Sequence, residues 1–290
     1  MKLEVSGKDI ILYDAEDFDL ISTFECGQCF RWERCSENEY IGIAYNKVLR
    51  IKKESDKITL YNTESADWDN IWQNYFDFGK SYEDIKNKLS GDSVLAEAIS
   101  FGSGIRILNQ EPFETLISFI ISASNNIPRI KGIIDRLCRN FGEEIKYMGE
   151  SYFAFPTPER LAALTLEELS VIRAGFRDKY ILAASNLIAS GEFNLDLLKT
   201  LPSSDAKAGL MKLNGVGNKV ADCVLLFGLG KYDSFPIDVW VKRIMEYCYF
   251  DGKDTSIAEI SMLASKLFGE YGGYAQQYLF YWARENKIGV

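Results

Sequence analysis

The hydrophobic periodicity of the chain changes near residue 80, and this change limits the folds open to it. Upstream, apolar and polar residues alternate in short runs bounded by turn residues, which is the pattern of antiparallel strands. These runs are residues 10–13, 29–33, 40–45, 48–52 and 58–62. Downstream, apolar residues recur at helical spacing. The chain therefore predicts an α+β fold in which an antiparallel sheet precedes a helical part.

The downstream half carries helix start signals as well as helical periodicity. Pro158 stands at a first helical position, and Thr165 and Glu168 have the spacing of a capping box. The predicted helices cover residues 81–89, 92–101, 112–124, 129–141, 179–189, 204–213, 219–229, 238–249, 256–268 and 273–284. We expect an N-terminal sheet domain with flanking helices over residues 1–110 and an all-helical domain over residues 111–290.

Composition narrows the chemistry, because the 290 residues include no histidine. Ser-His-Asp and Cys-His nucleophile pairs and histidine zinc sites are thereby excluded, which leaves carboxylates, lysine, cysteine and tyrosine. The net charge of −9 argues against a protein that coats nucleic acid by charge alone. A local basic groove is still compatible, since residues 124–139 and 199–219 each carry four basic residues and one acidic residue.

Six cysteines are spread along a chain too long to need disulfides for stability. Cys26, Cys29 and Cys35 lie close together, but a Cys-x2-Cys spacing alone is a weak zinc pattern. We expect buried free thiols, with Cys29 on a strand, and no metal ligands. The acidic start of the chain does not resemble a signal peptide, and its apolar runs are too short to span a bilayer. We therefore expect a cytoplasmic protein that does not bind membranes.

Residues 213–222 read Leu-Asn-Gly-Val-Gly-Asn-Lys-Val-Ala-Asp and join two predicted helices. Gly215 and Gly217 permit a tight turn, and Asn218 is a good N-cap type for the second helix. Such a helix–hairpin–helix presents unpaired backbone N–H groups to a phosphate, so Gly215, Val216, Gly217 and Asn218 are candidate phosphate contacts. A plain turn between helices would use the same glycines, and the residues that follow distinguish the two interpretations.

Lys219 stands at the start of the second helix, where the helix dipole and burial favour the neutral amine, a nucleophile. Nineteen residues later, Asp238 is the expected N-cap of another helix, with Pro236 stiffening its approach. A fixed carboxylate beside a neutral amine suits a reaction in which positive charge develops on a sugar ring. Either residue alone would more often be a surface lysine or an ordinary cap.

The sequence resembles the helix–hairpin–helix (HhH-GPD) DNA glycosylase superfamily, and within it the 8-oxoguanine DNA glycosylase/AP lyase branch. Residues 213–223 and 235–239 resemble the hairpin with its nucleophile and the aspartate segment. Gly-Gln-Cys-Phe-Arg-Trp at 27–32 resembles the N-terminal motif of that branch. Three further segments resemble parts of that branch. The asparagine-rich wedge is matched by residues 122–130, the opposite-strand loop by 174–177, and the helix that closes the base pocket by 273–280.

The resemblance implies a bifunctional enzyme of base excision repair acting on double-stranded DNA that contains 8-oxoguanine. Lys219 would attack C1′, expel the flipped base and cleave the strand by β-elimination through a Schiff base, while Asp238 stabilises the sugar cation. Cys223 and Phe280 would sandwich the base, Gln276 would bond its Watson–Crick edge, and the Gly27 carbonyl would accept from N7–H. Taken alone, Cys223 and Phe280 would more often be core residues.

Further contacts to DNA are implied for the wedge, the opposite-strand loop and the aspartate helix. These residues are Asn125, Asn126, Arg129, Phe176, Arg177 and Trp240. Arg129 and Arg177 would contact the base left behind, although a solvated or phosphate-bound arginine is a serious alternative for Arg177. Carbonyls near Met211, Leu213 and Val216 could hold a monovalent ion, as in relatives; otherwise we expect no cofactor, and a monomer.

Three residues depart from the family pattern: Phe176 and Ser124 leave the preference for the opposite base open, and Trp240 bears on affinity instead of chemistry. Phe176 replaces the usual tyrosine, Ser124 the first asparagine of the wedge, and Trp240 a frequent phosphate-binding histidine. Two other functions stay open: a glycosylase for another damaged base, and a non-catalytic module that uses the hairpin only as a phosphate clamp. The second would be indifferent to the loss of Lys219.

Overall fold

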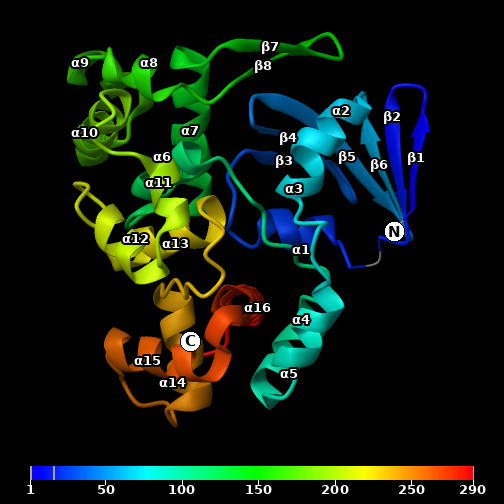
Figure 1. The fold of residues 1–290 in the computed structure, drawn as a ribbon, viewed down its shortest axis with the longest axis vertical. Helices are drawn as coiled ribbons and strands as arrows, with labels where there is room; N and C mark the ends of the chain where they lie inside the picture. Colours follow the sequence, from blue (N-terminus) through cyan, green and yellow to red (C-terminus); the bar gives the residue numbers. More distant parts are fainter. Residues whose placement is uncertain (1, 16, 290) are drawn as a thin grey trace.

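The structure is a computed structural model that describes residues 2–15 and 17–289. Its strands are β1 Lys2–Ser6, β2 Asp9–Tyr13, β3 Trp32–Ser36, β4 Glu39–Ala44, β5 Lys47–Glu54, β6 Lys57–Tyr61, β7 Glu144–Tyr147 and β8 Glu150–Phe153. The first six form one antiparallel sheet in the order β1-β2-β6-β5-β4-β3, and β7 and β8 form a separate hairpin. The predicted sheet-first, helices-after arrangement is confirmed (Figure 1).

Aromatic side chains fill the core beneath the six-stranded sheet. Trp32 on β3 stacks on Phe24, with ring centroids 4.1 Å apart, and its indole N–H donates to the Tyr75 hydroxyl at 2.8 Å. Gly42 on β4 faces the Trp32 ring so closely that a Cβ there would lie 2.2 Å from it. The close approach of the indole therefore explains the glycine at this position of β4, because no larger residue fits there.

The helices after residue 80 form a second, larger hydrophobic core, whereas Leu20, Phe24 and Tyr75 from earlier helices pack in the core of the sheet. The helices of the whole chain are α1 Leu20–Glu25, α2 Ser65–Asp67, α3 Gln73–Tyr75, α4 Tyr82–Leu89, α5 Ser93–Phe101, α6 Pro112–Ser122, α7 Ile127–Phe141, α8 Pro158–Ala162, α9 Leu166–Leu169, α10 Asp178–Ala189, α11 Leu195–Thr200, α12 Ser203–Leu210, α13 Asn218–Gly228, α14 Val239–Tyr249, α15 Ile257–Phe268 and α16 Gly272–Asn286. The division near residue 110 stays a prediction; α4 and α5 precede it, yet Ile85 and Leu95 belong to the helical core.

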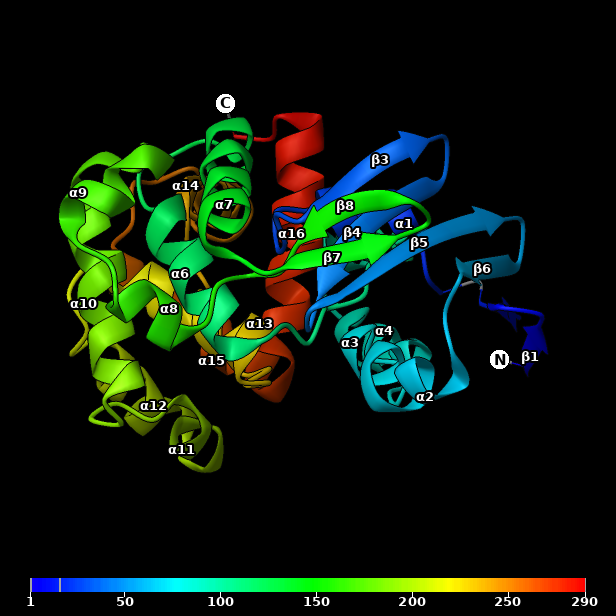
Figure 2. The same ribbon diagram turned by 90° about the horizontal axis from the view of Figure 1, so that it is seen from above.

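α16 lies in the middle of the molecule, between the sheet and the other helices (Figures 1 and 2). It packs against α5 on one side and against α14 and α15 on another. The β7–β8 hairpin reaches from the helical half to the sheet, where the Tyr147 hydroxyl donates to the Tyr61 carbonyl at 2.6 Å. Along the described parts of the chain, no helix combines the length and the apolar character that crossing a bilayer requires.

Several local predictions were wrong. β1 and the β7–β8 hairpin were missed, because β1 is exposed along its whole length and the hairpin is only half-buried, so neither shows clean alternation. The short helices α1 and α11 were missed as well. Cys29 precedes β3 instead of lying on a strand, because residues 26–31 form a loop held by side-chain bonds. All six thiols are free, and Cys35 is exposed, contrary to the expectation of buried thiols throughout.

Candidate active site

The hairpin between α12 and α13 leaves the first turn of α13 without a side-chain cap. Gly217, not Asn218, is the N-cap, so the predicted cap was wrong by one residue. Gly215 has a φ of +86°, and a Cβ there would lie 2.7 Å from the Tyr180 ring. At Gly217 a Cβ would meet nothing within 4 Å. The uncapped N–H groups therefore face open space, as a phosphate-binding helix start requires.

Lys219, the second residue of α13, directs its amine into a cavity in the helical half. Its Nζ donates to Ser122 Oγ at 3.2 Å and lies 4.9 Å from the centre of the Phe119 ring. Ser122 is buried and itself donates to the Phe119 carbonyl at 2.8 Å. The end of α6 therefore positions the amine, a contact that the sequence pattern did not indicate.

Asp238 lines the same cavity from the start of α14. Its Oδ1 accepts from the Val241 N–H at 2.9 Å, which confirms the predicted N-cap. Burial raises the pKa of the Asp238 carboxyl, while the capping bond to Val241 and the nearby Lys219 charge act in the opposite direction. The capping bond thus fixes the carboxylate, and Lys219 acts on it through its charge.

The cavity brings the two predicted reacting residues and the four predicted base-pocket residues together. Its lining is Cys26, Gly27, Phe119, Lys219, Cys223, Phe227, Pro236, Asp238, Gln276, Gln277 and Phe280. Burial raises the pKa of the Cys223 thiol to about 11, with Lys219 lowering it. The cavity volume of about 40 Å³ is close to the share of one water molecule in the liquid, about 30 Å³. A purine can therefore enter only if side chains of the wall move.

Gln28 explains how Gly27 is presented to the cavity. The buried Gln28 amide donates to the Thr23 and Arg106 carbonyls at 2.9 and 2.8 Å and accepts from the Leu108 N–H at 2.9 Å. Gly27 itself has a φ of +81°, and a Cβ there would lie 3.3 Å from the Phe280 ring. The second residue of the N-terminal motif thus holds the first in a conformation that suits glycine.

The turn between α6 and α7 carries the predicted wedge residues. The Asn125 amide donates to the Ile121 carbonyl at 3.1 Å, and Asn126 caps α7 by accepting from the Arg129 N–H at 3.0 Å. Arg129 is exposed, and Ser124 has a φ of 49°, a left-handed conformation that asparagine adopts more readily. The turn is therefore shaped by its own asparagines and projects Arg129 from the surface.

Arg177 is only 3% exposed, which rules out the solvated alternative. Its guanidinium donates to the Ala123 carbonyl at 3.1 Å and to the Ser124 carbonyl at 3.2 Å, so it clamps the wedge turn. Burial and the Arg129 charge both lower the pKa of Arg177. Phe176, in contrast, is 59% exposed and projects beside this pair. All three guanidinium nitrogens of Arg177 thus donate to backbone carbonyls, including that of Ala174, whereas Arg129 and the Phe176 ring are exposed at this edge.

Trp240 lies two residues after Asp238, on the first turn of α14, and is half-buried. The Arg243 guanidinium lies 5.5 Å from the centre of its ring. Among the residues that the structure describes, no three His, Cys, Asp or Glu side chains gather in a way that could hold a metal ion. Trp240 is thus placed at the edge of the helix that carries Asp238, outside the cavity lining.

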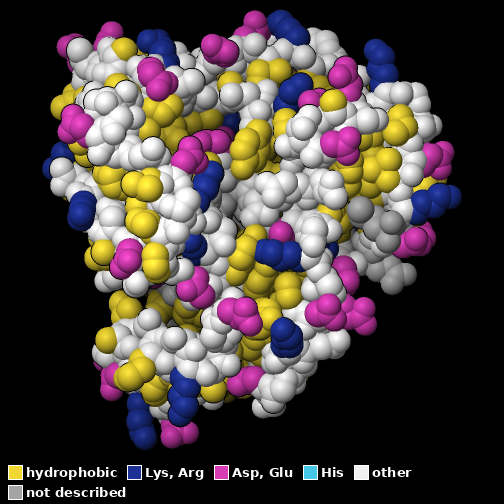
Figure 3. Space-filling model, viewed as in Figure 1, with side chains coloured by type: hydrophobic (Ala, Val, Ile, Leu, Met, Phe, Trp, Pro, Cys, Tyr) yellow, Lys and Arg dark blue, Asp and Glu magenta, His cyan; other side chains and the backbone are white. Residues whose placement is uncertain are grey.

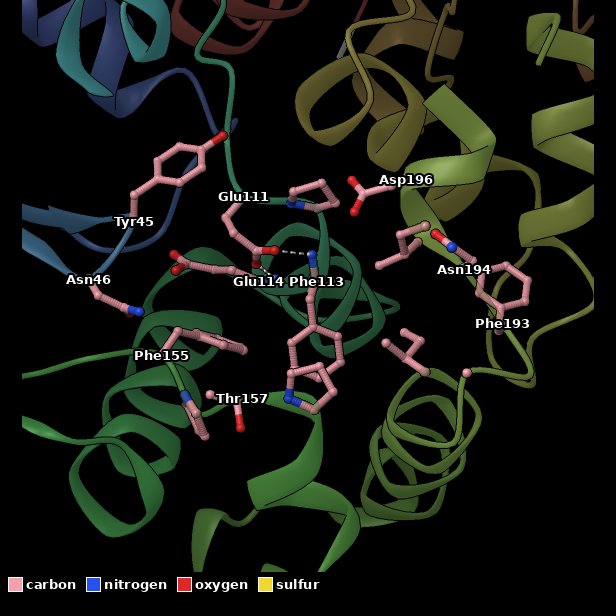
Figure 4. Close-up of a pocket in the computed structure, with 16 residues that line it drawn as sticks. Tyr45, Asn46, Glu111, Phe113, Glu114, Phe155, Thr157, Phe193, Asn194 and Asp196 are labelled. Carbon is pink, nitrogen blue, oxygen red and sulfur yellow. Dashed lines mark hydrogen bonds between the residues drawn. The ribbon is translucent and has the colours of Figure 1, made fainter. Parts of the chain in front are cut away.

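A larger pocket of about 440 Å³ lies elsewhere, between Tyr45, α6 and α11, and is lined by three carboxylates (Figure 4). Glu111 caps α6 by accepting from the Phe113 N–H at 3.1 Å, and Glu114 is paired with Arg31 at 3.1 Å. Asp196 lies in the first turn of α11, where it pairs with Lys199. These carboxylates serve the fold, and no lysine is among the residues that line the pocket.

The contact between Ser122 and Lys219 gives a prediction. Ser122→Ala should slow base excision about tenfold, because the amine loses the hydroxyl that aims it, while the helix end stays intact. Single-turnover excision rates at saturating enzyme would measure this. Ser118→Ala, one turn earlier on α6 and also buried, is the matched control and should leave the rate unchanged. Equal rates for all three proteins would show that the hydroxyl does not position the amine.

Comparison with known proteins identifies two consecutive family regions in the chain. Residues 10–116 match the N-terminal domain of 8-oxoguanine DNA glycosylase. Residues 117–269 match the HhH-GPD superfamily of base excision DNA repair proteins. The two regions together include both the hairpin with Lys219 and the segment with Asp238.

Individual relatives agree with these matches. The N-glycosylase/DNA lyase of Saccharomyces cerevisiae is 31% identical, over 90% of this chain and 82% of the yeast protein. A probable N-glycosylase/DNA lyase of Methanothermobacter thermautotrophicus is 32% identical, over 73% of this chain and 74% of its own. One similar structure is that of the 8-oxoguanine glycosylase/lyase of Clostridium acetobutylicum in complex with double-stranded DNA containing cytosine opposite 8-oxoguanine. It superposes on this chain with a TM-score of 0.96, is 42% identical in sequence, and the match covers 99% of each chain. The chain therefore belongs to the HhH-GPD superfamily of base excision DNA repair proteins and carries the N-terminal domain of the 8-oxoguanine DNA glycosylases.

Proposed function

We propose that the protein is a bifunctional DNA N-glycosylase and AP lyase that excises 8-oxoguanine from duplex DNA. One observation carries this proposal: a lysine amine and a capped aspartate line the same cavity, next to the uncapped start of α13. A glycosylase with a lysine nucleophile needs these parts together. The relatives named above, which are glycosylase/lyases, agree with this activity.

The chemistry follows from the two side chains. The Lys219 amine attacks C1′ of the flipped nucleotide with its lone pair as the glycosidic bond breaks, and the base leaves with the bonding electron pair and takes up a proton. Asp238, held by the Val241 N–H, stabilises the positive charge that develops on the sugar. Ring opening gives a Schiff base on Lys219. Loss of a C2′ proton and departure of the 3′ phosphate then cleave the strand by β-elimination.

DNA binding in this proposal relies on backbone groups more than on charge. The first turn of α13, with Gly215, Val216, Gly217 and Asn218, binds a phosphate, and Trp240 contacts the backbone nearby. On the face shown in Figure 3, basic and acidic side chains are interspersed. Because phosphate binding through N–H groups needs no excess of lysine, it is compatible with a net charge of −9.

The base pocket in this proposal uses Cys223 and Phe280 on the two faces of the flipped purine, Gln276 on its Watson–Crick edge and the Gly27 carbonyl at N7. The N7–H proton exists in 8-oxoguanine and not in guanine, so guanine would place two acceptors against each other. Asn125 and Asn126 enter the vacated stack, and Arg129 and Arg177 meet the base left behind. We also propose that the protein acts as a cytoplasmic monomer, associated with the nucleoid if its source is prokaryotic; a monovalent ion at the Met211, Leu213 and Val216 carbonyls stays a prediction.

The activity is tested with a duplex that carries one 8-oxoguanine. The purified protein should release the base, cleave the strand and form a covalent complex in borohydride. Duplexes with 3-methyladenine or an oxidised pyrimidine should be cut far more slowly. Release of those bases without release of 8-oxoguanine would show that the protein is a glycosylase for another damaged base. Binding of the duplex without strand cleavage would show that it is a non-catalytic module that binds phosphate through the hairpin.

Phe176 gives a prediction for the opposite base. Phe176→Tyr should sharpen discrimination among the four bases opposite the lesion by about three- to tenfold, because the added hydroxyl can donate or accept at the exposed tip of the ring. Excision rates of 8-oxoguanine paired with each base would measure this. Phe101→Tyr, an exposed phenylalanine on α5, is the control and should leave the ratios unchanged. Unchanged ratios in the Phe176 variant would remove this ring from opposite-base recognition.

A further inference from the structure

Two adjacent glutamines of α16, Gln276 and Gln277, both line the cavity. Gln277 is 3% exposed, and its Oε1 is buried without a hydrogen-bond partner among the residues that the structure describes. Buried polar atoms in folded proteins nearly always have a partner, because leaving one unpaired costs stability. An unpaired acceptor in the wall of a substrate cavity therefore indicates that the substrate supplies the donor.

The other atoms of the pair restrict which donor this is. Gln277 Nε2 donates to Gln276 Oε1 at 3.1 Å, which fixes the orientation of both amides. An amide oxygen has two lone pairs, so Gln276 Oε1 can accept one further hydrogen bond, and Gln277 Oε1 can accept another. The cavity wall thus offers two adjacent acceptors, both from α16.

We propose that Gln277 is a second base-reading residue, whose Oε1 accepts from the exocyclic 2-amino group of the flipped purine. This inference rests on the proposed function. A 2-amino-6-oxopurine carries a ring N1–H and a 2-amino group side by side, which matches one donor to each glutamine oxygen. A 6-aminopurine presents an N1 acceptor in place of the N1–H and only a C2–H in place of the 2-amino group, so one glutamine oxygen faces a lone pair and the other has no donor. The pair of glutamines therefore selects guanine-type bases, and the Gly27 carbonyl selects the oxidised form.

The test compares 8-oxoguanine with 8-oxohypoxanthine, which has the same N1–H and N7–H donors and lacks only the 2-amino group. The wild-type protein should excise 8-oxoguanine about tenfold faster, because the analogue leaves Gln277 Oε1 unpaired. Gln277→Met, which keeps the length of the side chain without its polar atoms, should slow excision of 8-oxoguanine about tenfold. The same variant should excise the analogue at nearly the wild-type rate, so the preference falls to within about twofold.

Tyr278→Phe is the matched control. The Tyr278 hydroxyl is also buried and unpartnered on α16, but it does not line the cavity, so this variant should keep the tenfold preference. The ratio of the excision rates of the two substrates, measured on one protein preparation, does not depend on the fraction of the protein that is folded. Gln277→Ala is a second variant and should lose the preference as well. Equal slowing of both bases by Gln277→Met would overturn the inference and leave the proposed function standing. A wild-type protein that excises neither base would overturn both.

Discussion

Replacing Lys219 by glutamine is expected to abolish covalent trapping by borohydride and to lower base excision by at least about a thousandfold. Glutamine is one bond shorter than lysine but stays polar and keeps an N–H donor on the side of the cavity where Lys219 Nζ donates to Ser122 Oγ. Its amide nitrogen is not a nucleophile, so no bond to C1′ and no Schiff base can form. Trapping on a duplex with one 8-oxoguanine and the single-turnover release of the base would measure both losses.

The control for this change is Lys212→Gln, which removes the same charge from the exposed hairpin approach without touching the cavity. It should weaken DNA binding slightly, in a salt-dependent way, and leave trapping intact. Lys219→Gln should bind the duplex about as well as Lys212→Gln does. A Lys219→Gln protein that still forms the covalent complex would exclude Lys219 as the nucleophile and require another amine in the site.

The order of sheet and helices could be predicted because each half has strong periodicity, and caps at Thr165, Asp238 and Ser256 set helix starts in the sequence. The β7–β8 hairpin could not be predicted, because its stability comes from tertiary contacts such as the hydrogen bond from the Tyr147 hydroxyl to the Tyr61 carbonyl. Local pattern therefore indicates an element only where the local sequence, and not a distant neighbour, decides the conformation.

The site shows the same limit. Lys219 and Asp238 could be selected because a helix start and an N-cap are local features. The residues that support them could not: Ser122 lies 97 positions before Lys219, and Gln28 bonds to Arg106, 78 positions away. Both residues lie in segments that resemble the family, 122–130 and 27–32, but no spacing assigns Ser122 to the Lys219 amine or Gln28 to the Arg106 carbonyl. Only the fold brings these side chains to the amine and to Gly27.

Asp238→Asn is expected to slow base excision by about a hundred- to a thousandfold while the protein stays folded. Asparagine caps helices as well as aspartate, so the bond from the Val241 N–H to the side chain is kept and only the negative charge is lost. The sugar cation then forms without its stabilising anion. Single-turnover excision at saturating enzyme would measure the loss, and Asp92→Asn, which changes another N-cap on α5, should leave the rate unchanged.

The pH dependence and the stability of this variant separate a catalytic charge from a structural one. Because burial raises the pKa of Asp238, its carboxylate becomes protonated at a higher pH than an ordinary aspartate, and excision should fall as the pH drops through that raised pKa. The neutral asparagine has no such titration, so this acid limb should disappear in Asp238→Asn. By linkage, a carboxyl whose folded-state pKa is raised stabilises the fold when protonated and loses that contribution as the pH rises through the raised pKa. At neutral pH the Asp238→Asn variant should therefore unfold at the wild-type temperature or above it. If the carboxylate only held the fold together, the variant would unfold at a lower temperature, and excision and stability would be lost in parallel.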